Sequence, residues 1–156
     1  MKADPKIIAD LQSAVQMLLT ASEQYRVDKK QLKGIDLDWL AHKVGHWYDD
    51  AECNAGIMLK RLIAFDTDPS YAIGKVAGGG NVTDLLTRDL KGAQSLFDAL
   101  CQYRKNAWNI RADSVCDIYE HAIQDVEKWI ICMERELKLI AGMGLPGYIG
   151  SRLEDA

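Results

Sequence analysis

The chain has 156 residues, of which 48% are hydrophobic and 27% are charged, and its formal net charge at pH 7 is −4. These proportions are typical of one folded globular domain and exclude a largely disordered chain. The small negative charge argues against nucleic acid as a partner, because nucleic-acid binding requires a basic surface. The longest apolar run, Trp129 to Met133, is far too short to span a membrane, so we expect no membrane association.

The four cysteines are far apart in the sequence and include no Cys-x-x-Cys pair. Scattered thiols are typical of the reducing cytoplasm rather than of a secreted disulfide framework. The first residues, MKADPKIIADLQ, contain no apolar signal core. We therefore expect a cytoplasmic protein. The cysteines are Cys53, Cys101, Cys116 and Cys132.

The first predicted helix covers about residues 5–33. Pro5 suits a first helical turn after the N-cap candidate Asp4, and Gly34 suits the end of the helix. Between them, one helix face recurs at alternating steps of three and four residues. Its members are Ile8, Leu11, Val15, Leu18, Ser22 and Tyr25, of which only Ser22 is a weak core residue.

The second predicted helix covers about residues 37–65, with Asp36 as its N-cap candidate and Pro69 beyond its end. Because only a few residues join it to the first helix, the two helices should be antiparallel neighbours. Its expected buried face consists of Leu40, Val44, Trp47, Ala51, Asn54, Met58, Leu62 and Phe65.

Residues 66–80 break the helical pattern and end in three consecutive glycines. The segment contains Tyr71, Ile73 and Val76, so we expect it to pack across the outside of the bundle. A connection of this length lets the second and third helices run parallel, which a short hairpin cannot do.

Two further long helices are predicted over about residues 82–108, with Asn81 as N-cap candidate, and 113–141. A short helix over about 146–153 follows Gly144. The sequence thus predicts an all-α fold, a single four-helix bundle over residues 1–156 with a long crossover between the second and third helices. The expected buried faces are Val82, Leu86, Leu90, Ala93, Phe97 and Leu100, then Val115, Tyr119, Ala122, Val126, Trp129, Met133 and Ile140.

Residues along essentially the whole chain carry a resemblance to a known family. They are the N-terminal MKADPKII, Tyr25, Arg61, Pro69, the Arg88–Asp89–Leu90 cluster and the C-terminal series Glu134, Glu136, Leu137, Leu139, Ile140, Met143, Gly144, Leu145 and Tyr148. In this order and spacing they resemble bacterioferritin, of the ferritin-like superfamily. The resemblance implies a ferritin-like bundle, twofold-paired subunits and a hollow twenty-four-subunit cage.

The resemblance also implies a di-iron ferroxidase centre, built from four carboxylates and two histidines that include two Glu-x-x-His pairs. None of the residues at the six ligand positions is a good ligand for iron. Four buried carboxylates without metal would repel one another, and apolar replacements remove that cost. We therefore expect a ferroxidase site converted to core, without a di-iron centre or ferroxidase activity. By position the six ligands fall at Leu18, Ala51, Asn54, Ala93, Val126 and Trp129.

Asn54 is the polar residue of this converted site, and a buried amide needs hydrogen-bond partners. We hypothesise that its carbonyl accepts the indole N–H of Trp129 between the second and fourth helices. An ordered water is the alternative partner.

The family binds haem between paired subunits through one methionine from each, and that position holds Glu52 here. A carboxylate is a poor partner for haem iron, and Ser22, Glu23 and Arg26 make the pocket polar. We expect no ordinary haem site, which leaves the cofactor unassigned. Glu52 and the adjoining Cys53 are the candidates for an altered cofactor site at this interface.

Another face of the second helix carries His46 and Asp50, which match a pair that in bacterioferritin faces the cage interior and assists iron binding. A His–Asp pair one turn apart can share a metal ion, and His42 adds a possible third ligand. The competing interpretation is an ordinary solvated face, which is common on exposed helices. We further expect His121 to be exposed or capping, and Glu136 to be a surface charge or salt-bridge partner.

Three functional hypotheses follow. The first is a cage or oligomer subunit without a working ferroxidase centre, in a structural, storage or scaffold role, alone or mixed with an active bacterioferritin. The second is a protein that holds a different metal, cofactor or cargo at the subunit interface or inner surface. The third, and the weakest, is a relocated catalytic metal site that uses His46 and Asp50.

Overall fold

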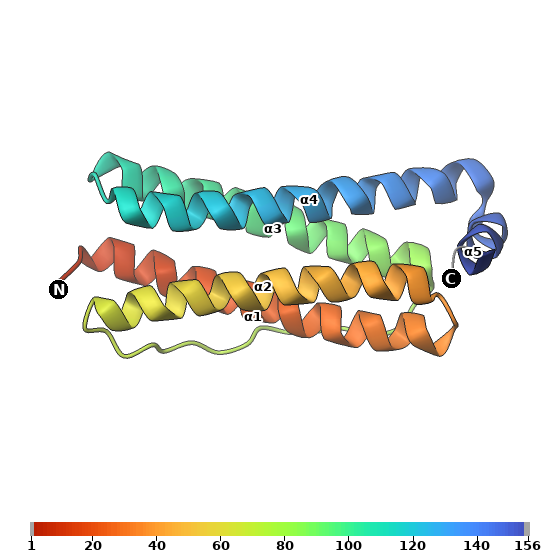
Figure 1. Cartoon of the computed structure of the whole chain (residues 1–156), viewed down its shortest axis with the longest axis horizontal. Coiled ribbons are helices and arrows are strands. Elements are labelled where there is room, and N and C mark those ends of the chain that lie inside the picture. The colour runs from red at the N-terminus through yellow and green to blue at the C-terminus, as the bar shows by residue number, and fades with distance from the viewer. Residues whose placement is uncertain (1, 155–156) are drawn as a thin grey trace.

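The computed structural model describes residues 2–154, which form five helices and contain no β-strand. The first four are long and the fifth is short, which confirms the predicted all-α architecture of a ferritin-like four-helix bundle (Figure 1). No helix in this range is both long and apolar enough to cross a membrane. The helices are α1 (Pro5–Gly34), α2 (Asp38–Ala64), α3 (Val82–Asn109), α4 (Asp113–Met143) and α5 (Leu145–Glu154).

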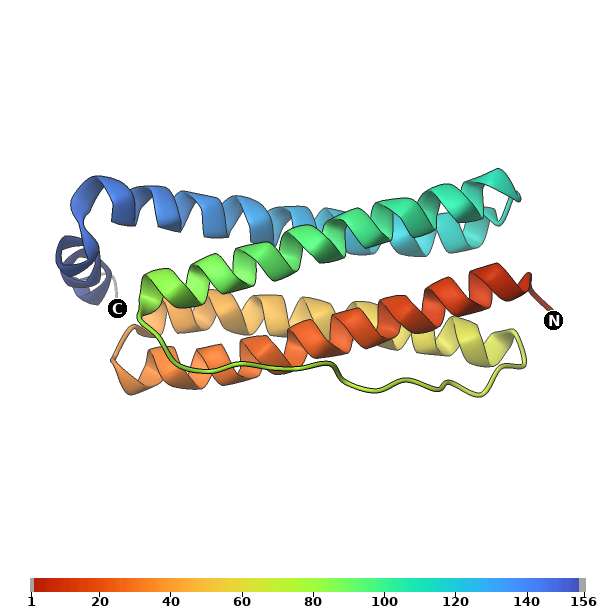
Figure 2. The same cartoon turned by 180° about the vertical axis from the view of Figure 1, so that it is seen from behind.

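Short turns join α1 to α2 and α3 to α4, and one long crossover joins α2 to α3. Helix α2 runs back along α1, and residues 66–80 then travel the length of the bundle before α3 begins (Figures 1 and 2). As a result α2 and α3 run parallel, as predicted, and α4 runs antiparallel to α3. Helix α5 lies across the end of the bundle, where it contacts α4 and α2.

Side-chain caps fix two of the helix starts. Asp4 accepts the Lys6 backbone N–H at 2.7 Å, and Asn81 and Asp84 form a reciprocal capping box at the start of α3. The predicted Asp36 cap of α2 is wrong. Asp36 adopts a left-handed conformation (φ 61°) in the α1–α2 turn, and Leu37 occupies the N-cap position without a side-chain bond.

The buried faces follow the predicted periodicity closely. Every predicted core residue of α2 and α4 is buried, whereas on α1 Ile7 is buried and Ile8 only half-buried. On α3, Leu90 and Phe97 are half-buried because Leu85 and Leu96 take their places in the core. The core also holds six polar side chains: Asp10, Ser22, Asp28, Asn54, Asp89 and Glu136.

The crossover packs on the outside of the bundle, as expected, and polar contacts with α1 hold it there. The backbone N–H of Gly74 donates to Thr20 Oγ1 at 2.8 Å, and the Gln24 amide forms two bonds with the backbone of Ala77. Tyr71 and Ile73 stay exposed, at 42% and 53% of their surface. The apolar residues of the segment therefore contribute little to its attachment.

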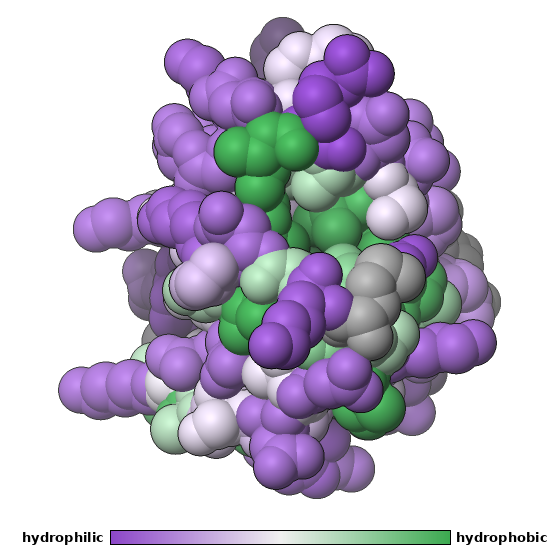
Figure 3. Space-filling view, turned by 90° about the vertical axis from the view of Figure 1, so that its left-hand side faces the viewer, coloured by the Kyte–Doolittle hydropathy of each residue, from purple (hydrophilic) through white to green (hydrophobic). Residues whose placement is uncertain are grey.

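One end of the bundle presents apolar side chains among charged ones (Figure 3). Near the α3–α4 turn, which lies at this end, Trp108 is 62% exposed and Ile110 49%. Large exposed apolar groups of this kind are typical of contact surfaces when they cluster.

Candidate functional site

The six positions of the expected ferroxidase centre all lie in the bundle core, at no more than 2% exposure. Four of them carry aliphatic side chains with no donor atom for a metal. Iron sites need oxygen or nitrogen lone pairs, and the indole N–H of the fifth, Trp129, is a donor only. The residues present therefore do not fit a di-iron centre. In residues 2–154, no three His, Cys, Asp or Glu side chains are grouped to hold a metal ion.

Trp129 fills the centre of this region. Its indole N–H donates to Asp50 Oδ2 at 2.9 Å, which ties α4 to α2. Its ring meets Tyr25 edge to face at a centroid distance of 5.5 Å, and Tyr25 meets Trp47 in the same manner at 5.6 Å. Burial, with the nearby Asp89 and Asp28 charges, raises the pKa of Tyr25 well above its ordinary value, so this phenol stays neutral.

Asn54 is fully hydrogen-bonded within the protein, but not to Trp129, so that hypothesis is wrong. Its amide N–H groups donate to the Asp50 backbone oxygen and to Asp125 Oδ2, both at 2.8 Å. Because both donors face acceptors, its oxygen must accept, and it does so from His121 Nδ1 at 2.8 Å. The carboxylate of Asp50, one turn earlier on α2, takes the indole N–H instead.

Sequence reasoning missed this network as a unit. His121 is exposed, as expected, yet its ring nitrogen reaches the buried Asn54. The available signal was spacing: Asp50 and Asn54 are four residues apart on α2, and His121 and Asp125 are four apart on α4. Two such pairs on antiparallel helices can face each other, but one sequence does not reveal the register between the helices.

The position of the family's haem methionine is a polar surface here. Glu52 Oε1 accepts the Ser22 hydroxyl at 2.6 Å, and Glu23 forms a two-bond ion pair with Arg26. Glu52 and Cys53 are both exposed. A carboxylate already bonded to a hydroxyl in a charged setting does not fit haem iron, which favours histidine, methionine or thiolate ligands.

The proposed inner-surface residues are divided between two arrangements. The exposed His42 and His46 point their Nε2 atoms at each other, 3.2 Å apart, with their rings edge to face. Asp50 is half-buried, and one of its carboxylate oxygens is committed to Trp129. The structure therefore brings the two histidines together and turns Asp50 toward α4.

Replacing Trp129 with phenylalanine should lower the free energy of unfolding by about 1–2 kcal/mol, because Asp50 loses a hydrogen bond that it makes while half-buried. Urea unfolding of the two proteins measures the difference. In a variant that already carries Asp50→Ala, the same change should cost clearly less, since the bond is gone. Equal costs in both backgrounds would contradict a role for this bond.

Comparison with known proteins gives a consistent family of relatives. A bacterial ferritin of Pseudomonas aeruginosa is 24% identical over 163 residues, covering 98% of this chain and all of the relative. The chain is similar to bacterial ferritins from end to end. A bacterioferritin of Brucella melitensis is 27% identical over 158 residues, with 95% and 92% coverage, and a bacterial ferritin of Paramagnetospirillum magnetotacticum is 28% identical over 164 residues, with 99% and 96% coverage. No protein-family model matches the sequence. The similarity and the fold together support placement in the ferritin-like superfamily.

Proposed function

We propose that this chain is a subunit of a bacterioferritin-like cage or oligomer that has no ferroxidase centre of its own. Its role is structural, as a storage shell or scaffold, either alone or mixed with an active bacterial ferritin. Full-length similarity to bacterial ferritins supports the assembly, and the same similarity supports a cytoplasmic location. We infer twofold pairs through the α1–α2 surface that carries Glu52. The exposed apolar groups near the α3–α4 turn supply further contact surface.

The observation that carries this proposal is the place of Trp129. A metal pair inside a bundle needs inward carboxylates to offset its charge. Here an indole occupies a ligand position, and its one polar atom is bonded to Asp50. The polar groups around it, Asn54, Asp125 and His121, are bonded to one another. These hydrogen bonds join α2 to α4 in the place where, in the expected ferroxidase centre, a metal pair would join the helices.

Iron oxidation by the purified protein tests the proposal. Fe(II) is added without oxygen, air is admitted, and Fe(III) formation is followed by near-ultraviolet absorbance beside a bacterial ferritin with intact ligands. We expect the rate to equal that of Fe(II) in buffer alone. Light scattering after size exclusion measures the assembly, which we expect to be a closed oligomer. Rapid, saturable oxidation would overturn the absence of a ferroxidase centre, and a stable monomer would overturn the cage.

A second candidate function, metal binding on the exposed face of α2, rests on the histidine pair. Two Zn–N bonds of about 2.0–2.1 Å on a tetrahedral ion place the two nitrogens about 3.3–3.4 Å apart. The Nε2 atoms of His42 and His46 are 3.2 Å apart without a metal. This separation suits the chelation of one divalent transition-metal ion by the two histidines alone, because Asp50 is turned toward α4 and bonded to Trp129.

Calorimetric titration with Zn²⁺ and Ni²⁺ distinguishes this site from a solvated face. We expect one ion per chain, lost on His42→Ala and on His46→Ala. His121→Ala is the matched control, because it removes an exposed histidine that has no histidine neighbour. Unchanged stoichiometry in the His46 variant would eliminate the site.

A further inference from the structure

A cavity of about 490 Å³ lies between α1, α3 and the crossover. This volume is within the range of about 300–1,000 Å³ that is typical of small-molecule sites. Its walls are mostly apolar, and small residues on α3, Gly92 and Ala93, leave the space open. A Cβ atom added at Gly92 would meet no atom within 4 Å. The pocket is open at Gly92, which is exposed, and a side chain at this position has room beside α3.

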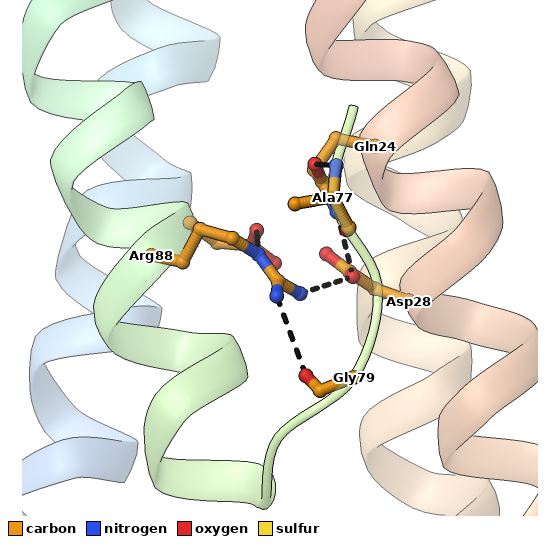
Figure 4. A network of polar contacts seen from close by, with 6 residues as sticks. Gln24, Asp28, Ala77, Gly79 and Arg88 are labelled. Carbon is orange, nitrogen blue, oxygen red and sulfur yellow. Dashed lines mark hydrogen bonds and ion pairs between the residues drawn. The ribbon is translucent and has the colours of Figure 1, made fainter. Parts of the chain in front are cut away.

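Two charged residues, Arg88 and Asp89, line the cavity at what we call its charged end. Figure 4 shows Arg88 directed toward Asp28, which lies behind this lining. Arg88 Nη2 contacts Asp28 Oδ1 at 2.8 Å and Nη1 reaches the Gly79 carbonyl at 3.4 Å. Gln24 also donates to Asp28 Oδ1 at 3.0 Å. One oxygen of Asp28 is thus well bonded, and the Arg88 guanidinium is directed to it and to the crossover.

The remaining carboxylate oxygens have no donor. Both oxygens of Asp89 and Oδ2 of Asp28 are buried without a hydrogen-bond partner, although Asp89 is 3% exposed and Asp28 fully buried. Arg88 Nε, a buried donor that is itself without a hydrogen-bond partner, is 3.8 Å from Asp89 Oδ1, which is too long for a hydrogen bond. Two carboxyl groups therefore share one guanidinium, and of these three oxygens only the two of Asp89 belong to a residue that lines the cavity. Unsatisfied buried acceptors of this kind call for an explanation.

We propose that the cavity binds a primary aliphatic amine, with its ammonium group on the Asp89 carboxylate and its hydrocarbon chain along Ala93, Leu96 and Met17. An ammonium carries three N–H donors and one positive charge. The two oxygens of Asp89 can accept these N–H groups, and once Asp89 loses its proton, the pair carries one negative charge more than Arg88 offsets. The apolar walls supply the favourable burial of the chain.

Other ligand classes fit this end of the cavity less well. A carboxylate head would add a third negative group beside two acidic side chains. A quaternary ammonium has the charge but no N–H donor, and an alcohol has one donor and no charge. Lys75, on the crossover, is exposed and lies at the rim, and the Tyr25 hydroxyl, although it is a possible donor, makes no hydrogen bond to Asp89 or to Asp28 Oδ2. Neither supplies the missing donors at the charged end.

A proton competes with the amine for the same oxygens. Burial and the neighbouring Asp28 raise the pKa of the Asp89 carboxyl well above its usual range, while Arg88 opposes the shift more weakly. The empty pair therefore keeps one proton, and ammonium binding must release it. Amine affinity should accordingly rise with pH through the neutral range, where an alkylammonium stays charged like a lysine side chain.

The test uses four six-carbon probes: n-hexylamine, n-hexanol, hexyltrimethylammonium and hexanoate. Calorimetry near pH 8, in two buffers of different ionisation enthalpy, measures affinity and proton release. We expect n-hexylamine to bind one per chain with release of close to one proton, at least about tenfold more tightly than the other three. Asp89→Asn should lose that preference, and Gly92→Leu should block all four by filling the cavity.

Asp10→Asn is the matched control, because Asp10 is an equally buried aspartate that pairs with Lys6 and Asn106 away from the cavity. It should bind n-hexylamine as the original protein does, and circular dichroism confirms that each variant is folded. Equal affinity for the amine and the alcohol would reduce the cavity to an apolar pocket and overturn the proposal. Unchanged amine binding by Asp89→Asn would also overturn the proposal, and so would the absence of amine binding by the original protein. In either case the carboxyl pair would have only a structural role. These results are independent of iron oxidation and cage assembly.

Discussion

Replacing Arg152 with alanine should lower the free energy of unfolding by about 3 kcal/mol, because it leaves a buried carboxylate without its counter-charge. Glu136 is fully buried on α4 and accepts from Arg152 on α5 at 2.8 Å through both oxygens. Tyr148 also donates to it, at 2.7 Å. The guanidinium further stacks on Trp39 at 3.8 Å from the ring centroid, so α5 is fastened to α4 and α2 together.

The loss in the free energy of unfolding cannot exceed the free energy needed to detach α5 from the bundle. Once α5 is detached, water reaches Glu136 and the buried charge is no longer unpaired. Urea unfolding measures the global effect, and limited proteolysis of the C-terminal segment measures undocking. Arg135→Ala is the control, since Arg135 is exposed and lies 3.6 Å from the same carboxylate. It should cost less than about 1 kcal/mol. Equal losses in the two variants would show that Arg152 acts only as a surface charge.

The helices and their order were predictable because the sequence signals that specify them act between residues close together in the chain. Helix periodicity, Pro5 with Asp4, and the glycines of the crossover each act within a few residues. The failure at Asp36 has the same origin: aspartate suits both an N-cap and a left-handed turn, and the tight α1–α2 hairpin required the second. Local propensity does not decide between two roles that one residue type fills equally well.

The polar interior was much less predictable. Periodicity placed Asn54 in the core, but its partners Asp125 and His121 come from α4 and depend on how two helices are offset. Glu136 was expected as a surface charge or a salt-bridge partner. It is the latter, but fully buried, because α5 folds back over it with Arg152. From a sequence alone, a charged residue is predicted to lie on the surface. Only the three-dimensional arrangement shows which charged residues are buried and form ion pairs or hydrogen bonds there.

The pair Asp28 and Asp89 shows the same limit. Each lies on a buried helix face next to apolar positions, and nothing local marks them as neighbours. They meet because α1 packs on α3, and Arg88, which directly precedes Asp89, pairs with Asp28. Asp89 and Arg88 entered the sequence argument only as residues of a family resemblance. Their physical role, a charge-deficient carboxyl pair beside a cavity, comes from the packing.

Replacing Asp89 with asparagine should stabilise the protein above neutral pH. Burial and the adjacent Asp28 carboxyl raise the pKa of Asp89 in the folded chain, whereas in the unfolded chain it is about 3.9. Between these two values the folded chain holds a proton that the unfolded chain releases. The free energy of unfolding therefore falls as pH rises, by up to about 1.4 kcal/mol per unit. Asparagine does not titrate, and its amide N–H can donate to the orphan oxygen of Asp28.

Urea unfolding at a series of pH values from mildly acidic to mildly alkaline tests this. The two proteins should differ least in stability near pH 4, close to the unfolded-state pKa, where the pH-dependent loss only begins, and the variant should gain about 2 kcal/mol or more by pH 8. Asp10→Asn, which removes an aspartate bonded to Lys6 and Asn106, should lose stability and keep the original pH slope. Parallel slopes for Asp89→Asn and the original protein would mean that Asp89 is ionised in the fold and held by Arg88. Two ionised carboxylates would then face one guanidinium, and the proton competition expected for amine binding would disappear with the slope.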